Sequence, residues 1–159
     1  MRLRVESRSA ADTQQIGEIL GRHLRAGDVV GLSGDLGAGK TELVRGLARG
    51  LDIDPDVIYS PSFTLVAEHE GRIRLNHIDL FRLGEPVSSQ EEEEIGLTDY
   101  LSPAGVTAVE WHRKLGSISV AWTLEADFAI ASGDRRTLVF EGRGARAAAI
   151  LGALEATWR

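Results

Sequence analysis

The residues that decide this fold read Gly34-Asp35-Leu36-Gly37-Ala38-Gly39-Lys40-Thr41. They fit the pattern G-x-x-x-x-G-K-[ST], in which glycine conformations aim successive backbone N–H groups at a phosphate. The positive end of the following helix dipole acts at the same point. Lys40 is expected to reach the terminal phosphates, and the Thr41 hydroxyl is expected to bind Mg²⁺. The stretch therefore predicts a site for ATP with magnesium.

The surroundings of this loop match what the motif requires. Residues 29–33 form a short apolar run that ends in a glycine at position 34, which is typical of a buried strand. After the loop, one helical face carries the apolar side chains of Leu43, Val44, Leu47, Ala48 and Leu51. A strand, a glycine-rich loop and a helix thus follow one another in the expected order.

The use of lysine supports the same interpretation. The chain has 18 lysines and arginines, but only Lys40 and Lys114 are lysines. An ammonium is a compact charge, whereas a guanidinium is a broad planar group that fits a tight phosphate loop poorly. A sequence that otherwise uses arginine keeps lysine at the position where the phosphate loop needs it.

Strand and helix patterns alternate along the rest of the chain. Residues 3–5 suit an edge strand, and Asp12 or Thr13 is expected to cap the next helix. Hairpins are expected over residues 63–68 with 73–80 and over 122–130 with 137–140, a strand over 106–111, and a closing helix over 145–158. The pattern predicts an α/β fold, a three-layer sandwich of the P-loop NTPase type with a mixed sheet, in a single domain over residues 1–159.

Composition narrows the class of protein. Hydrophobic residues make up 43% and charged residues 26% of the chain, and there is no cysteine, so disulfides and thiolate metal sites are excluded. No run approaches the roughly 18 apolar residues of a spanning helix, and the first residues do not form a signal peptide, so we expect no membrane contact and a cytoplasmic protein. The net charge of −6 argues against a chain that grips nucleic acid by itself.

Two carboxylates are candidates to complete the phosphate site. Asp79 and Glu110 each follow a short apolar strand, where an open α/β sheet places its ligands, and both are predicted to serve the metal or the catalytic step. His77, two residues before Asp79, is interpreted as a structural strand histidine. The acidic run 91–94 favours a solvated helix start, with a docking or switch segment as the alternative.

Five separated segments resemble one family, TsaE, formerly called YjeE. They are the loop Gly34–Thr41, Ser60-Pro61-Ser62-Phe63-Thr64-Leu65, His77-Ile78-Asp79-Leu80-Phe81-Arg82-Leu83, Glu94-Ile95-Gly96-Leu97 and Glu110-Trp111. Their order and spacing match over about residues 13–111. The loop alone is shared by many families, whereas the set of five is specific.

The resemblance implies an ATPase of the bacterial machinery that installs N6-threonylcarbamoyl on adenosine 37 of tRNAs. Such a protein binds the TsaD–TsaB heterodimer, hydrolyses ATP weakly when alone, and meets tRNA only through the complex. By position, the resemblance puts Lys40 on phosphate, Thr41 and Glu110 on magnesium, Trp111 beside the nucleotide and Thr13 near the base. Asp79 is then the remaining strand-end carboxylate near the metal.

Three residues depart from the family pattern. Ser62 replaces a threonine and keeps the hydroxyl, Phe81 replaces a tyrosine, and His112 stands where proline is common. None lies in the phosphate loop, so these departures concern switching rather than nucleotide binding.

Two other functions remain open at this point. A small-molecule kinase on the same scaffold would carry an arginine-bearing lid, but Arg135 and Arg136 lie in a tight hairpin turn that favours a solvated loop. A nucleotide sensor without hydrolysis is the second alternative.

Overall fold

The computed structural model describes residues 1–101, 104–116 and 120–158. Its centre is a mixed seven-stranded sheet with the strand order β1-β7-β6-β2-β5-β4-β3. The strands are β1 (Arg2–Ser7), β2 (Val29–Ser33), β3 (Val66–His69), β4 (Leu75–Asp79), β5 (Val106–Glu110), β6 (Leu124–Ser132) and β7 (Arg135–Glu141). β4, β5, β2 and β6 are parallel, while β3, β7 and β1 run antiparallel to their neighbours.

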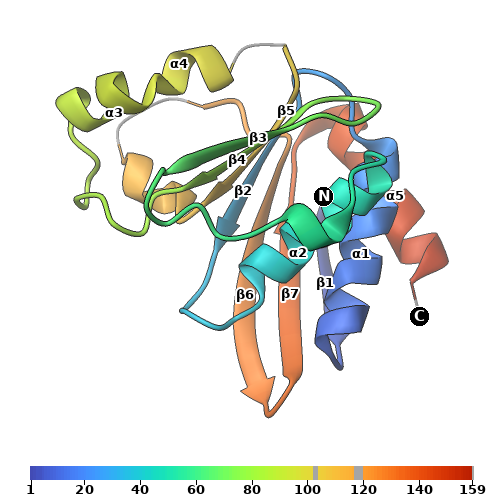
Figure 1. Ribbon diagram of the computed structural model, residues 1–159. Coiled ribbons are helices and arrows are strands. Elements are labelled where there is room, and N and C mark those ends of the chain that lie inside the picture. The colour runs from blue at the N-terminus through green and yellow to red at the C-terminus, as the bar shows by residue number, and fades with distance from the viewer. Residues whose placement is uncertain (102–103, 117–119, 159) are drawn as a thin grey trace.

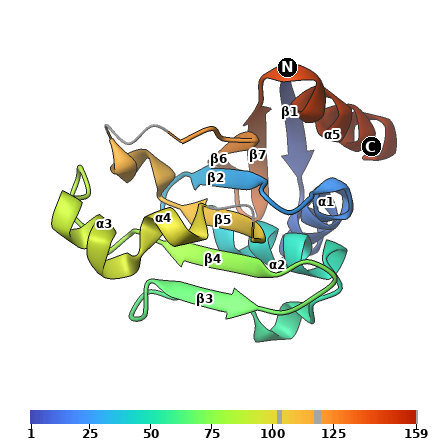
Figure 2. The same ribbon diagram turned by 90° about the horizontal axis from the view of Figure 1, so that it is seen from above.

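Helices cover both faces of the sheet (Figures 1 and 2). One side carries α1 (Ala10–His23), α2 (Lys40–Gly50) and α5 (Gly144–Thr157), whose apolar side chains share a single core with the strands. The other side carries α3 (Ser89–Ile95), α4 (Leu97–Tyr100) and the short 3₁₀ helix η2 (His112–Leu115), which pack against β4 and β5. A further 3₁₀ turn, η1, spans Pro55–Val57. The predicted three-layer α/β fold with a mixed sheet is confirmed.

The helices α1 and α2 pack unusually close together because glycines face each other at their contact. A Cβ added to Gly17 would lie 2.9 Å from the Cα of Gly46, and a Cβ added to Gly21 would lie 3.1 Å from the Cα of Gly50. In each helix the two glycines are four residues apart and therefore lie on one face. This contact fixes α2, whose first turn carries Lys40 and Thr41.

The predicted cap of the first helix is wrong by a few residues. Ser9 is the N-cap, and its side-chain oxygen accepts a hydrogen bond from the Asp12 backbone N–H at 3.1 Å. The Asp12 carboxylate instead accepts from the N–H of Arg8 at 2.9 Å. Thr13 lies in the first turn and is buried.

Two strands are shorter than their sequence patterns suggest. β3 begins at Val66 because Leu65 adopts a left-handed backbone (φ 68°) and its N–H donates to the Pro61 carbonyl at 2.7 Å. β5 ends at Glu110 because Trp111 is also left-handed, with φ 62°. Both changes turn the chain at the edge where the candidate site lies.

The acidic run forms the helix α3, as expected for a solvated helix start. Ser88 and Glu91 make a capping box, in which each side chain accepts a hydrogen bond from the other residue's backbone N–H. The hydrogen bond from the Ser88 backbone N–H to the Glu91 carboxylate, with a further one from the Gly84 N–H, lowers the pKa of the Glu91 carboxyl. Within the described residues, no helix combines the length and apolarity needed to cross a bilayer.

Candidate nucleotide-binding site

The loop Gly34–Thr41 follows the carboxyl end of β2, the central strand of the sheet, and leads directly into α2. Gly39 caps this helix with a left-handed backbone (φ 104°), which favours glycine. Gly34 has φ 145°, and a Cβ there would lie 2.7 Å from the carbonyl oxygen of Phe128 on β6. Glycine at position 34 is therefore required by the close approach of β6.

Lys40 is buried at the first turn of α2 and turns its ammonium back into the loop. Its Nζ donates to the carbonyl oxygens of Gly34 and Asp35, the latter at 3.0 Å. Burial lowers the pKa of Lys40, while the negative charges of Glu110, Asp79 and Asp35 oppose that effect. The cation thus lies inside the loop, where it can neutralise a bound phosphate.

Thr41 meets Glu110 at the mouth of the loop. Its Oγ1 donates to both carboxylate oxygens of Glu110, each at 3.1 Å. Since β5 is parallel to β2, the end of β5 lies beside the start of the loop although the two residues are 69 positions apart. The two residues expected to hold magnesium are therefore in contact.

Asp79 lies directly beside Glu110, because the two are register partners at the ends of β4 and β5. Both carboxylates are nearly fully buried, with 4% and 3% of each residue exposed. Asp79 accepts hydrogen bonds from the Ser60 hydroxyl at 2.5 Å and from the Phe81 backbone N–H at 2.9 Å. Each carboxylate thus has its own protein donors, which fix its orientation.

His77 also belongs to this cluster, which the sequence alone did not indicate. Its ring is fully buried, and its Nε2 lies 2.5 Å from Oε2 of Glu110. Because an ionised carboxylate can only accept, Nε2 carries the hydrogen. His77 lies in a strand, and its partner is the carboxylate expected to bind the metal, while its buried Nδ1 has no hydrogen-bond partner among the described residues. The hydrogen bond from His77 fixes the orientation of the Glu110 carboxylate, which also accepts from Thr41 at the end of the loop.

Trp111 forms one wall of the site and lies between the two lysines of the chain. The Nζ of Lys40 is 4.4 Å from the centre of its ring, and the Nζ of Lys114 is 5.6 Å from it. Lys114 donates to the carbonyls of Phe81 and Leu83 at 2.8 and 3.1 Å, and the Phe81 ring packs against Trp111. The tryptophan predicted beside the nucleotide therefore borders the loop lysine directly.

Thr13 lies near the loop, close to Gly39. Its hydroxyl is 2.6 Å from the Ser7 hydroxyl, and it donates to the Ser9 carbonyl at 3.3 Å. Its methyl carbon is 4.0 Å from where a Cβ on Gly39 would be. Its predicted place near the base stays a prediction.

The donor set fits Mg²⁺. This ion prefers oxygen ligands and is usually held by one or two carboxylates together with substrate phosphates, not by a complete protein cage. The Thr41 hydroxyl and the carboxylates of Glu110 and Asp79 supply such oxygens on one side of the loop. Among the described residues, no group of three or more His, Cys, Asp and Glu side chains is arranged to hold a metal ion.

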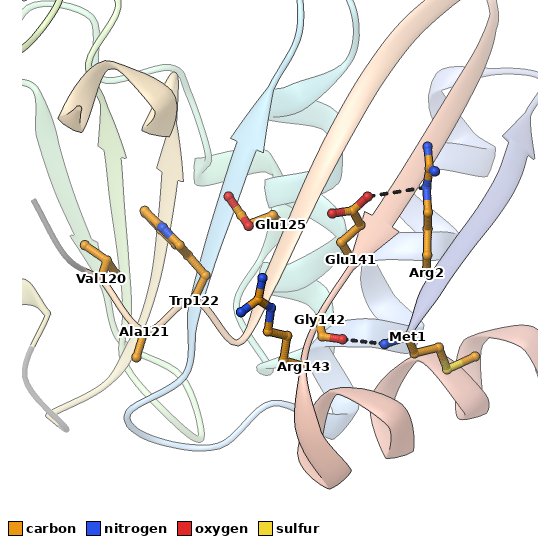
Figure 3. A pocket seen from close by; sticks show the side chains of 9 residues that line it. All are labelled: Met1, Arg2, Val120, Ala121, Trp122, Glu125, Glu141, Gly142 and Arg143. Atoms are coloured by element: carbon orange, nitrogen blue, oxygen red, sulfur yellow. Dashed lines mark hydrogen bonds and ion pairs between the residues drawn. The ribbon is translucent and has the colours of Figure 1, made fainter. Parts of the chain in front are cut away.

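Most of the candidate residues line one cavity of about 340 Å³, among them Gly37, Lys40, Thr41, Asp79, Glu110 and Trp111. The lining of this cavity does not include Thr13, Gly34, Asp35 or Ala38. A larger cavity of about 710 Å³ lies at the other end of the sheet, around Trp122 and Arg143 (Figure 3). Two of its polar pairs bond to each other: Arg2 with Glu141 at 3.3 Å, and the Met1 amine with the Gly142 carbonyl at 2.6 Å. Ligands of open α/β sheets bind at the carboxyl ends of the strands, so the smaller cavity is the candidate site.

Comparison with known proteins identifies related chains. A family model described as "Threonylcarbamoyl adenosine biosynthesis protein TsaE" matches residues 7–138. A relative from Treponema pallidum (strain Nichols), named "tRNA threonylcarbamoyladenosine biosynthesis protein TsaE", is 39% identical over 138 residues, which cover 86% of this chain and 99% of that protein. A protein of the same name from Nostoc sp. is 46% identical over 108 residues, covering 65% of this chain and 64% of that protein.

The fold is also found in a solved structure. The crystal structure of YdiB from Bacillus subtilis superposes with a TM-score of 0.79 at 28% sequence identity, covering 98% of this chain and 95% of that one. The family match includes the loop, both strand-end carboxylates and Trp111.

Proposed function

Because this chain belongs to the TsaE family of threonylcarbamoyl adenosine biosynthesis proteins, we propose that it binds and hydrolyses ATP within the bacterial machinery that modifies adenosine 37 of tRNA. It acts as a single ATPase domain over residues 1–159, together with the TsaD–TsaB heterodimer. It reaches tRNA only through that complex, in the cytoplasm.

One observation carries the ATPase proposal: the loop lysine, the loop threonine and two strand-end carboxylates border the same cavity. These residues come from α2, β4 and β5, so only the folded chain brings them together. A phosphate loop with a neighbouring strand-end acid is the arrangement that holds a nucleoside triphosphate with its magnesium ion. The backbone N–H groups of the loop, and α2 behind them, supply the remaining donors.

Each residue then has a separate task. The Thr41 hydroxyl and Glu110 would hold Mg²⁺, which would supply charge neutralisation for the phosphates when bound. Lys40 exchanges its bonds to the loop carbonyls for bonds to the terminal phosphates. Asp79 orients the metal's water shell or the attacking water, because its carboxylate faces the same cavity and is held by Ser60 and Phe81.

The resting contacts support the proposal that the isolated chain hydrolyses ATP only weakly. Lys40 and Thr41 are both engaged with protein atoms, so nucleotide binding has to replace these hydrogen bonds. A partner that bound next to Trp111 would favour the exchange by stabilising the nucleotide-bound arrangement. Stimulation by TsaD–TsaB is therefore part of the proposal.

The deciding experiment measures phosphate release from ATP with magnesium, for the chain alone and with the TsaD–TsaB pair from the same genome. We expect slow release by the chain alone, faster release with the pair, and none with Lys40→Ala. Transfer of the γ-phosphate to a small molecule would instead identify a kinase. Tight ATP binding without phosphate release, with or without the TsaD–TsaB pair, would identify a sensor. Absence of ATP binding would refute the proposal.

A further inference from the structure

The β6–β7 hairpin reaches the phosphate loop. Figure 1 shows that this hairpin extends past the end of β2, so that its outer part lies alongside the loop. Of the two arginines after its turn, Arg135 is exposed and Arg136 is half-buried. Both arginines belong to β7 and not to the turn itself, so the predicted turn position is wrong for both; Arg135 is nevertheless solvated, as the sequence favours, and Arg136 is not.

Arg136 connects the hairpin to the loop through its guanidinium. Its Nη2 donates to the carbonyl oxygen of Gly37 at 3.1 Å, across 99 positions of the chain. Its Nη1 donates to the carbonyls of Gly133 and Arg135 at 2.6 and 3.0 Å, so the side chain is held in place by its own hairpin. An anchored guanidinium of this kind loses little further freedom when it bonds to the loop.

The bonded part of the loop has little other support. Residues 35–37 are exposed, and no atom lies within 4 Å of where a Cβ on Gly37 would be. The N–H of Ala38 donates to the Asp35 carbonyl at 3.0 Å. The peptide group between Gly37 and Ala38 is thus bonded at both ends, by Arg136 at its oxygen and by the loop at its nitrogen. Hydrogen bonds, not packing, determine its orientation.

Nucleotide binding makes this contact more important. Lys40 holds the carbonyls of Gly34 and Asp35 in the structure, but an ammonium that turns to a phosphate releases them. Arg136 bonds to the outer side of the loop and can keep its contact while phosphate occupies the inner side. The hairpin would then support the loop after its internal lysine contacts are lost.

We propose that Arg136 is a positioning residue, which holds the exposed half of the phosphate loop in the shape that binds nucleotide. The inference rests on the proposed function, because it assumes that the loop binds nucleotide. It adds a part of the chain, the β6–β7 hairpin, that the phosphate-loop motif does not include.

The test compares Arg136→Ala and Arg136→Lys with the matched control Arg135→Ala, which removes the same charge from the neighbouring exposed position. The first measurement is the Kd for a fluorescent ADP analogue without magnesium. We expect about a fivefold higher Kd for Arg136→Ala, as for the net loss of one ordinary intramolecular hydrogen bond. Arg136→Lys should lie between that variant and the parent, and Arg135→Ala should match the parent.

A second measurement needs no nucleotide. Hydrogen exchange of a peptide covering residues 34–41 should be faster in Arg136→Ala than in the parent and in Arg135→Ala. Equal exchange and equal Kd for the two alanine variants would overturn the inference, even if the parent binds ADP well. A parent that binds no nucleotide would overturn the proposed function and this inference with it, and the parent's own titration distinguishes that case.

Discussion

Gly46→Ala tests whether the close contact of α1 and α2 determines the position of the phosphate loop. The added methyl carbon would lie 2.2 Å from the Gln14 carbonyl oxygen and 2.8 Å from the Cα of Gly17. A carbon–oxygen contact normally needs about 3.3 Å or more, so the helices would have to separate by roughly 1 Å. Both clashing groups are backbone, and neither can rotate away.

The size of the effect follows from two opposing terms. Overpacking a core contact costs about 1–3 kcal/mol, and the upper end applies where backbone meets backbone. Replacing glycine by alanine inside a helix gains about 1 kcal/mol. We therefore expect Gly46→Ala to lower the free energy of unfolding by about 2 kcal/mol, a large share of the ~5–15 kcal/mol typical of a domain.

Gly152→Ala in α5 is the matched control, because no atom lies within 4 Å of the position of its Cβ. It should keep the propensity gain alone and raise the free energy of unfolding by about 1 kcal/mol. Urea unfolding followed by circular dichroism measures both variants. If Gly46→Ala is as stable as Gly152→Ala, the proposed role of the glycine contact is wrong. Nucleotide affinity should also fall for Gly46→Ala, because α2 begins at Lys40.

Three further predictions follow, two on the site and one on tRNA binding. Lys40→Ala should lower the rate of ATP hydrolysis by about 10²-fold or more while the protein stays folded, because its ammonium bonds to loop carbonyls rather than to the core; an unchanged rate in a phosphate-release assay would contradict its role. Glu110→Gln should raise the magnesium concentration for half-maximal activity by about tenfold, whereas Asp79→Asn should lower the maximal rate and leave nucleotide affinity nearly unchanged. Kinetics across a magnesium series separates the two, and a shift seen only with Asp79→Asn would reverse the assignment. The isolated chain, with net charge −6, should show no appreciable tRNA binding at physiological salt, and sub-micromolar affinity in a gel shift would refute this.

Much of the site could be predicted from the chain order alone, because its central part is local. A strand, eight loop residues and a helix follow one another without interruption, and their backbone conformations depend on the glycines within them. The strand-end carboxylates can also be identified from the sequence, since Asp79 and Glu110 each end an apolar run. The cap of α1 was missed although Ser9 and Asp12 have the spacing of an N-cap and its third residue, because Asp12 and Thr13 competed as equally good caps.

The tertiary structure decided which side chains share the site. The parallel register of β4 and β5 places Asp79 beside Glu110. His77, on β4, also contacts the Glu110 carboxylate. The hairpin brings Arg136 to Gly37 across 99 positions. Such contacts depend on strand order and on the length of each strand, which many distant residues determine together. A sequence motif records the conformation of a short stretch, so the phosphate loop could be identified from its residues, while the groups that hold it in place are known only from the folded chain.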